Sequence, residues 1–187
     1  MRRVVITGVG AVSACGLGRE ALWHAARDGD SGVRETIFPR ILRQNVKHAA
    51  PVPREVWDEL ALSGNPRFQD RIAMAALAAA REAVDQAGLE PSDFGPRCSV
   101  VVGSGFGGAQ TLDINYHSLA TAPEKRADPF SIPKIMTNAA ASWIAMDMKA
   151  TGPLYCVSTA CSSAAQSIGL GAQLVAAGLA DRCLAGG

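Results

Sequence analysis

The sequence predicts an α/β fold in which helices cover both faces of a mostly parallel sheet. Short apolar or β-branched runs, typical of buried strands, alternate with longer helical segments, three of which stop at a glycine. Strands that alternate with helices in this way indicate βαβ units with a doubly covered sheet. The 187 residues, 48% apolar and 19% charged, have the composition of one globular domain.

In the first half of the chain, the expected elements are a buried strand over 2–8, a helix over 19–28 ending at Gly29, an irregular surface stretch over 30–66 that includes a short helix over 54–62, and an alanine-rich helix over 67–87 ending at Gly88. Alanine has the highest helix propensity, and a glycine after a helix readily takes the left-handed conformation that ends it.

In the second half, the expected elements are a strand over 97–102, a glycine run over 103–108, a helix over 109–119, a loop over 127–133, a helix over 134–148, a strand over 154–157, a helix over 162–177 ending at Gly178, and a strand over 181–185. We expect residues 1–187 to be a domain cut short, because Gly186 and Gly187 follow the last strand with no closing helix or polar tail.

Composition and cysteine spacing argue against several classes of function. A net charge of +1 without clusters of Lys and Arg is unlike a nucleic-acid-binding surface. The five cysteines form no C-x-x-C pair, so we expect neither a zinc site nor a disulfide framework, and a reducing, cytoplasmic compartment. The apolar residues 4–12 are too few for a signal peptide or a membrane span. No metal or redox cofactor is implied.

Cys161 is the strongest candidate for a catalytic residue. It follows the strand over 154–157 and precedes an Ala/Ser-rich helix, so its sulfur is expected at or near a helix amino terminus. Unpaired N–H groups and the positive end of the helix dipole stabilise a thiolate there, and the same groups can bind the oxyanion of an acyl transfer. The residues alone leave a second interpretation open, in which Cys161 is a small buried side chain, as most free cysteines are.

The other four cysteines offer weaker signals. Cys156 and Cys183 lie within apolar strand runs and Cys98 opens one, so all three are expected to be structural. Cys15 lies in a glycine-rich loop and is left unassigned.

Five motifs, in the expected order, resemble the β-ketoacyl-acyl carrier protein synthase family, particularly its chain-elongating members. Residues 157–164, VSTACSSA, resemble the segment around the family's active-site cysteine, and residues 3–10, RVVITGVG, are similar to its first strand. Residues 103–108, GSGFGG, residues 129–133, PFSIP, and the closing LAGG over 184–187 also match. The likeness covers nearly the whole chain and is weakest in the irregular stretch.

The resemblance implies a thiolase-like fold that pairs two similar βαβαβ halves, of which residues 1–187 would be the amino-terminal one, with the second half absent. The implied activity is that of a 3-oxoacyl-[acyl-carrier-protein] synthase of fatty-acid or polyketide synthesis. In that reaction Cys161 would take an acyl group from a carrier-protein or coenzyme A thioester. A malonyl-carrier unit then loses CO₂, and its carbanion attacks the acyl-enzyme to give a 3-oxoacyl product.

In the family, two histidines polarise the malonyl carbonyl, and a lysine and a Phe/Gly-rich loop complete the site, all in the second half. His24, His48 and His117 match none of those motifs and are expected to be structural or at the surface. Because the enolate must be stabilised as well as the thiolate formed, we expect that these residues alone do not complete the condensation. The alternative is a non-catalytic remnant that dimerises or binds carrier protein.

The glycine run over 103–108 has a rival interpretation. It satisfies G-x-G-x-x-G between a strand and a helix, which is the context of a dinucleotide-binding fingerprint and would indicate an NAD-binding Rossmann oxidoreductase. Against this, no strand ending in Asp or Glu follows at about 20 residues, where a ribose-binding carboxylate is expected. As part of a synthase, the glycines would let the backbone pass close to an acyl pocket.

Three apolar side chains are candidates for substrate binding. Phe106 is the one bulky residue of the glycine run; the matching position in elongating synthases borders the acyl chain, so Phe106 would limit chain length, although an ordinary core position is an equal alternative. Phe130 and Ile132 resemble a segment that approaches the partner subunit's pocket, which implies a homodimer or a ketosynthase-type partner. Acyl carrier protein is the other implied partner, with neither nucleic acid nor membrane.

Overall fold

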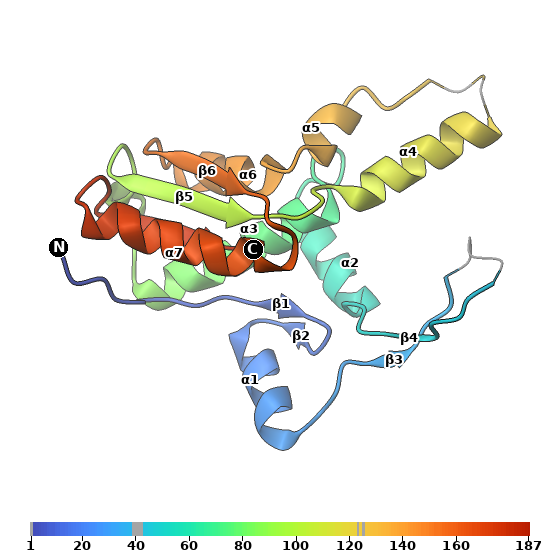
Figure 1. Ribbon diagram of the computed structural model, residues 1–187, viewed down its shortest axis with the longest axis horizontal. Helices are drawn as coiled ribbons and strands as arrows, with labels where there is room; N and C mark the ends of the chain where they lie inside the picture. The colour runs from blue at the N-terminus through green and yellow to red at the C-terminus, as the bar shows by residue number, and fades with distance from the viewer. Residues whose placement is uncertain (1, 39–42, 123, 125) are drawn as a thin grey trace.

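A computed structural model describes residues 2–38, 43–122, 124 and 126–187 (Figure 1). Its centre is a three-stranded sheet in the order β6–β5–β7, formed by Leu154–Val157, Cys98–Gly103 and Arg182–Gly186. β5 is parallel to both neighbours, and Val100 lies opposite Leu154 on one side and Leu184 on the other. The parallel sheet predicted from the alternation of strands and helices is confirmed.

Helices cover both faces of this sheet (Figure 1). α7, Ser163–Ala176, lies on one face, and α6, Ala139–Met148, lies on the other with α3, Arg71–Ala87, packed behind it. All six residues of β5 are buried, and its side chains alternate between the two layers. Val101 packs with Leu174 under α7, whereas Cys98, Val100 and Val102 face α3 and α6.

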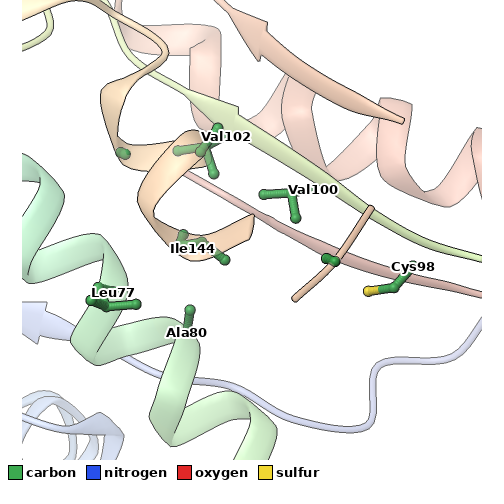
Figure 2. Close-up of a cluster of buried hydrophobic side chains, with 9 residues drawn as sticks. Leu77, Ala80, Cys98, Val100, Val102 and Ile144 are labelled. Atoms are coloured by element: carbon green, nitrogen blue, oxygen red, sulfur yellow. The ribbon is translucent and has the colours of Figure 1, made fainter. Parts of the chain in front are cut away.

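The larger core lies between the sheet and the α3–α6 layer (Figure 2). Leu77 and Ala80 of α3 and Ile144 of α6 meet Val100 and Val102 of β5 there. On the outer side of this layer, Arg81 binds Asp147 at 2.6 Å and joins the two helices.

The remaining elements lie around this centre. They are the helices α1, Arg19–Asp28, α2, Arg54–Ser63, α4, Ala109–Thr121, and α5, Ser131–Ile135, the 3-10 turns η1, Pro91–Asp93, and η2, Ala160–Ser162, and two antiparallel pairs, β1, Val12–Ser13, with β2, Gly16–Leu17, and β3, Arg34–Glu35, with β4, His48–Ala49. α2 packs on α3 through Val56, Leu60 and Met74. The β3–β4 pair belongs to the stretch that was expected to be irregular, of which residues 39–42 lie outside the described residues.

Most predicted helices and strands are present within a few residues of their expected bounds, with two instructive differences. α3 begins at Arg71 rather than at 67, because the carboxylate of Asp70 accepts the N–H of Ile72 at 3.2 Å and caps the helix there. The helix expected over 134–148 is two helices, α5 and α6. α5 already begins within the expected loop, where Pro133 is tolerated because first-turn residues need no N–H donor.

The buried strand predicted over 2–8 is wrong. Residues 2–11 belong to no strand, and Val5 and Ile6 are 59% and 81% exposed. The segment lies along α3 rather than beside a strand: Gly8 approaches the backbone of Ala83, and just beyond it Gln86 accepts the N–H of Val9 at 2.7 Å and Glu82 accepts that of Ala11 at 2.9 Å. A β-branched run indicates extended backbone, but the strand it pairs with is set by the rest of the fold.

Candidate active site

The carboxyl ends of β5 and β6 lie side by side, because the two strands are parallel and Gly103 is opposite Val157. β5 continues into the glycine run, and β6 continues into the turn that carries Cys161. The N–H of Ser104 donates to the carbonyl oxygen of Val157 at 3.0 Å and holds the two departing segments together. In parallel α/β sheets, this edge is where ligands bind.

Cys161 lies in the 3-10 turn that directly precedes α7, and its side chain is exposed. Ser162, the residue before the helix, makes no side-chain hydrogen bond to the first N–H groups of α7. The N–H of Ser163, the first residue of α7, donates instead to the carbonyl oxygen of Ala160 in the preceding turn. The sulfur is where the sequence placed it, next to a helix amino terminus, and it is accessible rather than buried in the core.

The glycine run allows the two segments to approach closely. A β-carbon on Gly103 would lie 2.4 Å from the carbonyl oxygen of Ser163, and one on Gly105 would lie 3.3 Å from the Cα of Ala160. Gly107, with φ of +67°, brings the run equally close to the carbonyl oxygen of Ile135 at the end of α5. A β-carbon on Gly108 would meet the carbonyl oxygen of Lys134, so backbone contacts within this chain account for Gly103, Gly105 and Gly108, the three glycines that also fit a dinucleotide fingerprint.

A cavity of about 450 Å³ opens between the glycine run, the Cys161 turn and the start of α3. Phe106 and Ile72 are its bulky apolar residues, and Cys161 and Ala164 line its opposite side. Phe106 is 70% exposed, so it is not an ordinary core residue in this structure. The volume lies within the range of about 300–1,000 Å³ that is usual for small-molecule sites. An exposed thiol beside an apolar hollow is an arrangement suited to forming a thioester with an acyl group.

The family model for the β-ketoacyl synthase N-terminal domain matches residues 1–187, the whole of the chain. This chain belongs to the β-ketoacyl synthase family. The NAD-binding Rossmann interpretation of the glycine run is overturned by that membership.

Several curated β-ketoacyl synthases and a nodulation protein are similar to the whole chain. The 3-oxoacyl-[acyl-carrier-protein] synthase 2 of Coxiella burnetii is 33% identical over all of this chain and 45% of that protein. The enzyme of the same description from Rhizobium meliloti is 34% identical, over 47% of its length, and nodulation protein E of Rhizobium sp. strain N33 is 33% identical, over 46%. The chain therefore spans less than half the length of these relatives.

Solved ketosynthases have the same fold. The ishigamide ketosynthase/chain length factor superposes with a TM-score of 0.83 at 29% identity, over 96% of this chain and 45% of that one. A β-ketoacyl synthase from Burkholderia phymatum STM815 superposes with a TM-score of 0.76 at 25% identity, over 96% and 45%. The ketosynthase AntDE, solved with the acyl carrier protein AntF and a hexaketide, shares the fold at 21% identity and a TM-score of 0.76, over 96% and 49%. The predicted thiolase-like fold is confirmed for the amino-terminal half.

Of the three substrate-binding residues suggested by the synthase resemblance, the structure brings only Phe106 to the cavity beside Cys161. The ring of Phe130 packs edge-on against Phe68, with centroids 4.5 Å apart, and the guanidinium of Arg67 lies 5.6 Å from it. Ile132 is 64% exposed. Neither Phe130 nor Ile132 lines this cavity.

The remaining cysteines in the synthase fold are placed differently from Cys161. Burial raises the pKa of the Cys98 thiol to about 11 and also raises the pKa of Cys183. Cys156 donates its thiol hydrogen to the carbonyl oxygen of Thr137 at 3.2 Å. A neutral or hydrogen-bonded thiol is a poor nucleophile, which leaves Cys161 as the exposed thiol of the site.

The histidines lie away from the cavity. The ring of His24 is 3.9 Å from the carboxylate of Glu20 on the exposed side of α1, and His48 and His117 are also exposed. Within the described ranges, no group of three or more His, Cys, Asp or Glu side chains is arranged to hold a metal ion. Among the helices of the described residues, none is both long and apolar enough to span a membrane.

Sequence reasoning missed two residues that shape the synthase cavity. Ile72 contributes a wall of it from the first turn of α3, a position for which the sequence carries no local signal. Asp70, 5% exposed, caps α3 and also accepts the N–H and the hydroxyl of Thr111 at 2.9 and 2.5 Å. One carboxylate therefore joins the first turns of α3 and α4. An Asp before an apolar helix is a known capping signal and could have placed the start of α3 correctly.

Proposed function

We propose that Cys161 is the nucleophile of a 3-oxoacyl-[acyl-carrier-protein] synthase-type acyltransferase, and that residues 1–187 carry out its acyl-capture step. The observation that carries the proposal is the exposed Cys161 thiol at the start of α7, which faces an apolar cavity in a chain of the β-ketoacyl synthase family. Amide N–H groups at a helix start favour the thiolate, and a hollow beside it can hold the acyl chain.

The first step forms one bond and breaks one. The Cys161 sulfur attacks the carbonyl carbon of an acyl thioester, and the electron pair of the carbon–oxygen double bond moves onto oxygen, where backbone N–H groups stabilise it. When the carbonyl re-forms, the carbon–sulfur bond to the carrier breaks, and the carrier leaves as its thiol with the proton that the Cys161 thiol has given up. The acyl group is then bound to Cys161.

The second step condenses this acyl group with a malonyl unit. Loss of CO₂ from malonyl-carrier protein leaves a carbanion at the α-carbon, which attacks the acyl carbonyl, and the Cys161 thiolate departs as the new carbon–carbon bond closes. The carbanion needs its own charge stabilisation, and none of the three histidines lies at the cavity. We therefore assign acyl capture, and not the whole condensation, to residues 1–187.

Mass spectrometry after incubation with an acyl-coenzyme A tests the nucleophile. We expect one acyl adduct, on the peptide that contains Cys161, and none in Cys161→Ala. Cys156→Ala is the matched control, because it removes a nearby thiol that is hydrogen-bonded rather than exposed at the cavity. Labelling of Cys161→Ala as strong as that of the parent would show that the nucleophile is elsewhere, and no adduct at all would favour the non-catalytic remnant.

Phe106 would limit the length of the acyl chain. Its side chain lines the cavity and is 70% exposed, so it occupies space that a longer chain would need. We expect Phe106→Ala to extend acylation of Cys161 toward longer acyl thioesters in a series of increasing chain length. Tyr116→Ala is the control, since Tyr116 is a similarly exposed aromatic residue, at 69%, on α4 outside the cavity lining. An unchanged chain-length profile would contradict the role of Phe106.

The acyl donor would be an acyl carrier protein, in the cytoplasm. An acyl carrier protein is bound to the AntDE ketosynthase, whose fold is the same, and this supports such a partner for the present chain. A nucleophilic thiol also has to stay reduced, which favours a reducing compartment.

The protein would act as a homodimer joined along β6. β6 is at the edge of the described sheet, with Leu154 and Tyr155 36% and 46% exposed, and an exposed edge strand favours pairing with a second chain. Ile132 and Met136, near the same edge, are 64% and 48% exposed, and Ile132 would then reach the partner's pocket, with Phe130 behind it. Light scattering should give a dimer mass for the parent and a monomer mass for Tyr155→Lys. If the parent is monomeric by itself but dimerises with another ketosynthase-type chain, the homodimer is wrong and the assembly is a heterodimer.

A further inference from the structure

One buried hydroxyl closes the turn that carries Cys161. The Oγ of Ser163 accepts the backbone N–H of Thr159 at 2.9 Å and donates to the carbonyl oxygen of Ala160 at 2.7 Å. Ser163 is 3% exposed, so water does not compete effectively for these bonds. Both partners precede Cys161 and Ser163 follows it, so the hydroxyl of Ser163 spans the residue that carries the thiol from its buried side.

The conformation of this turn requires such support. Ala160 has a φ of +52°, in the left-handed region, which is strained for a residue with a β-carbon. The hydrogen bond from Ser163 fixes the carbonyl of this same residue. The backbone of Ser163 is itself held against the sheet, because Gly103 of β5 approaches its carbonyl oxygen directly. The turn is thus held, through Ser163, against the fully buried strand β5.

We propose that Ser163 is a positioning residue, which fixes the direction of the Cys161 thiol and of the N–H groups of its turn relative to the bound acyl thioester. The proposal rests on the assignment of Cys161 as the acyl acceptor. Acyl transfer depends on the direction of attack and on N–H groups placed at the developing oxyanion. Alkylation of a thiol by a small reagent depends chiefly on access and on the thiolate fraction. A positioning residue therefore acts on the first reaction far more than on the second.

Two neighbouring serines provide matched comparisons. Ser162 is exposed, and its hydroxyl donates to the carbonyl oxygen of Thr159 at 2.8 Å without bonding to Ala160. Ser167 lies one helical turn after Ser163 on the same buried face of α7 and is 0% exposed. Its Oγ has no hydrogen-bond partner among the residues that the structure describes. Removal of either hydroxyl leaves both Ser163 hydrogen bonds in place.

The test compares two reactions of Cys161 in the whole protein that carries residues 1–187. Acylation by butyryl-coenzyme A is followed in a single turnover by mass spectrometry, and alkylation by iodoacetamide is followed on the same peptide. We expect Ser163→Ala to slow acylation by about 10- to 100-fold, the cost of a misplaced reacting group, with alkylation close to that of the parent. Ser162→Ala and Ser167→Ala should leave both rates near those of the parent. The concentration of thioester that gives half-maximal acylation should not change.

A second pair of variants keeps the test decisive if Ser163→Ala unfolds. The side chains introduced by Ser163→Thr and Ser163→Val have nearly the same shape and differ in the hydroxyl. Cys161 should therefore be acylated faster in Ser163→Thr than in Ser163→Val. Three results would overturn the positioning role while leaving Cys161 as the nucleophile. They are equal acylation rates in Ser163→Thr and Ser163→Val, acylation of Ser163→Ala at the parent's rate, and a loss of acylation matched by an equal loss of alkylation. If the parent forms no adduct at Cys161, both proposals are wrong.

Discussion

A β-carbon on Gly103 would lie 2.4 Å from the backbone carbonyl oxygen of Ser163, so the end of β5 touches the start of α7 backbone to backbone. Between these two segments there is no flexible side chain at this contact, so nothing can move aside to make room. The contact sets the distance between the central strand and the helix whose amino terminus carries Cys161. The first glycine of the run is therefore part of the support for the turn that carries Cys161.

Gly103→Ala is expected to destabilise the fold. The added methyl group would force β5 and α7 apart, and an overpacked core position typically loses about 1–3 kcal/mol of unfolding free energy. Urea denaturation measures the loss. Gly169→Ala, in the middle of α7 where a β-carbon meets nothing within 4 Å, should instead stabilise by about 0.5–1 kcal/mol through helix propensity. Similar effects of the two substitutions would show that the close approach at Gly103 is unimportant.

Leu77→Ala should cost about 2–5 kcal/mol of unfolding free energy, the range for a buried leucine that leaves a cavity. Leu77 is 4% exposed and lies between α3 and the sheet, facing Ile144 and Val100 (Figure 2). Leu62→Ala makes the same chemical change on α2 at a side chain that is 90% exposed, and should stay within about 0.5 kcal/mol of the parent. A loss below 1 kcal/mol at Leu77 would contradict its place in the larger core.

Glu82→Ala should loosen the first residues of the chain from α3. The carboxylate of Glu82 accepts the N–H groups of Ala11 and Arg19, both at 2.9 Å, and so holds the segment before α1 as well as the start of that helix. We expect a loss of about 1 kcal/mol and faster hydrogen exchange at these two amides. Glu59→Ala removes an exposed carboxylate of α2 as a control. Unchanged exchange at Ala11 would mean that other contacts hold this segment.

The unfolding free energy is expected to fall in acid, with Asp181 as one source. Hydrogen bonds from Arg97 and Arg2 hold the pKa of Asp181 well below its usual range. Below pH of about 4 the unfolded chain begins to bind a proton at this carboxyl while the folded protein does not, so stability decreases as the pH falls. Asp181→Asn should flatten this part of the stability profile. Asp58→Asn, which removes an exposed carboxylate 3.7 Å from Arg54, should leave it nearly unchanged.

The cysteines should react with iodoacetamide at pH 8 in an order set by burial. Cys161 is exposed and should be labelled first, whereas Cys98 is 1% exposed with a pKa of about 11 and should be labelled only after unfolding. Cys183, which is less buried than Cys98 but whose pKa is also raised by burial, should be labelled after Cys161 and before Cys98. Peptide mapping with and without urea checks the order. Early labelling of Cys98 would mean that the central strand opens more readily than its packing indicates.

Local sequence patterns determined the elements and the candidate nucleophile. Helix α1 and strand β6 have the predicted bounds, since a glycine ends the first and an apolar run defines the second. Cys161 could be found because a strand, small residues and a helix follow one another in the chain, and this order by itself places the cysteine at a helix start. The family resemblance of the surrounding residues then indicated what such a thiol does.

Only the tertiary structure decided what lies across from these elements. The segment over 2–8 has the residues of a buried strand, but it contacts helices instead: the N–H of Arg2 donates to the carbonyl oxygen of Ala176, and Gly8 lies against the backbone of α3 at Ala83. No local pattern encodes these contacts. Ile72 reaches the cavity because Asp70 joins the first turns of α3 and α4, a contact between residues 41 positions apart. Periodicity and capping act over a few neighbouring residues, whereas a cavity depends on packing between distant segments. The sequence could therefore identify Cys161, and only the fold could show Ser163 and Gly103 holding it in place.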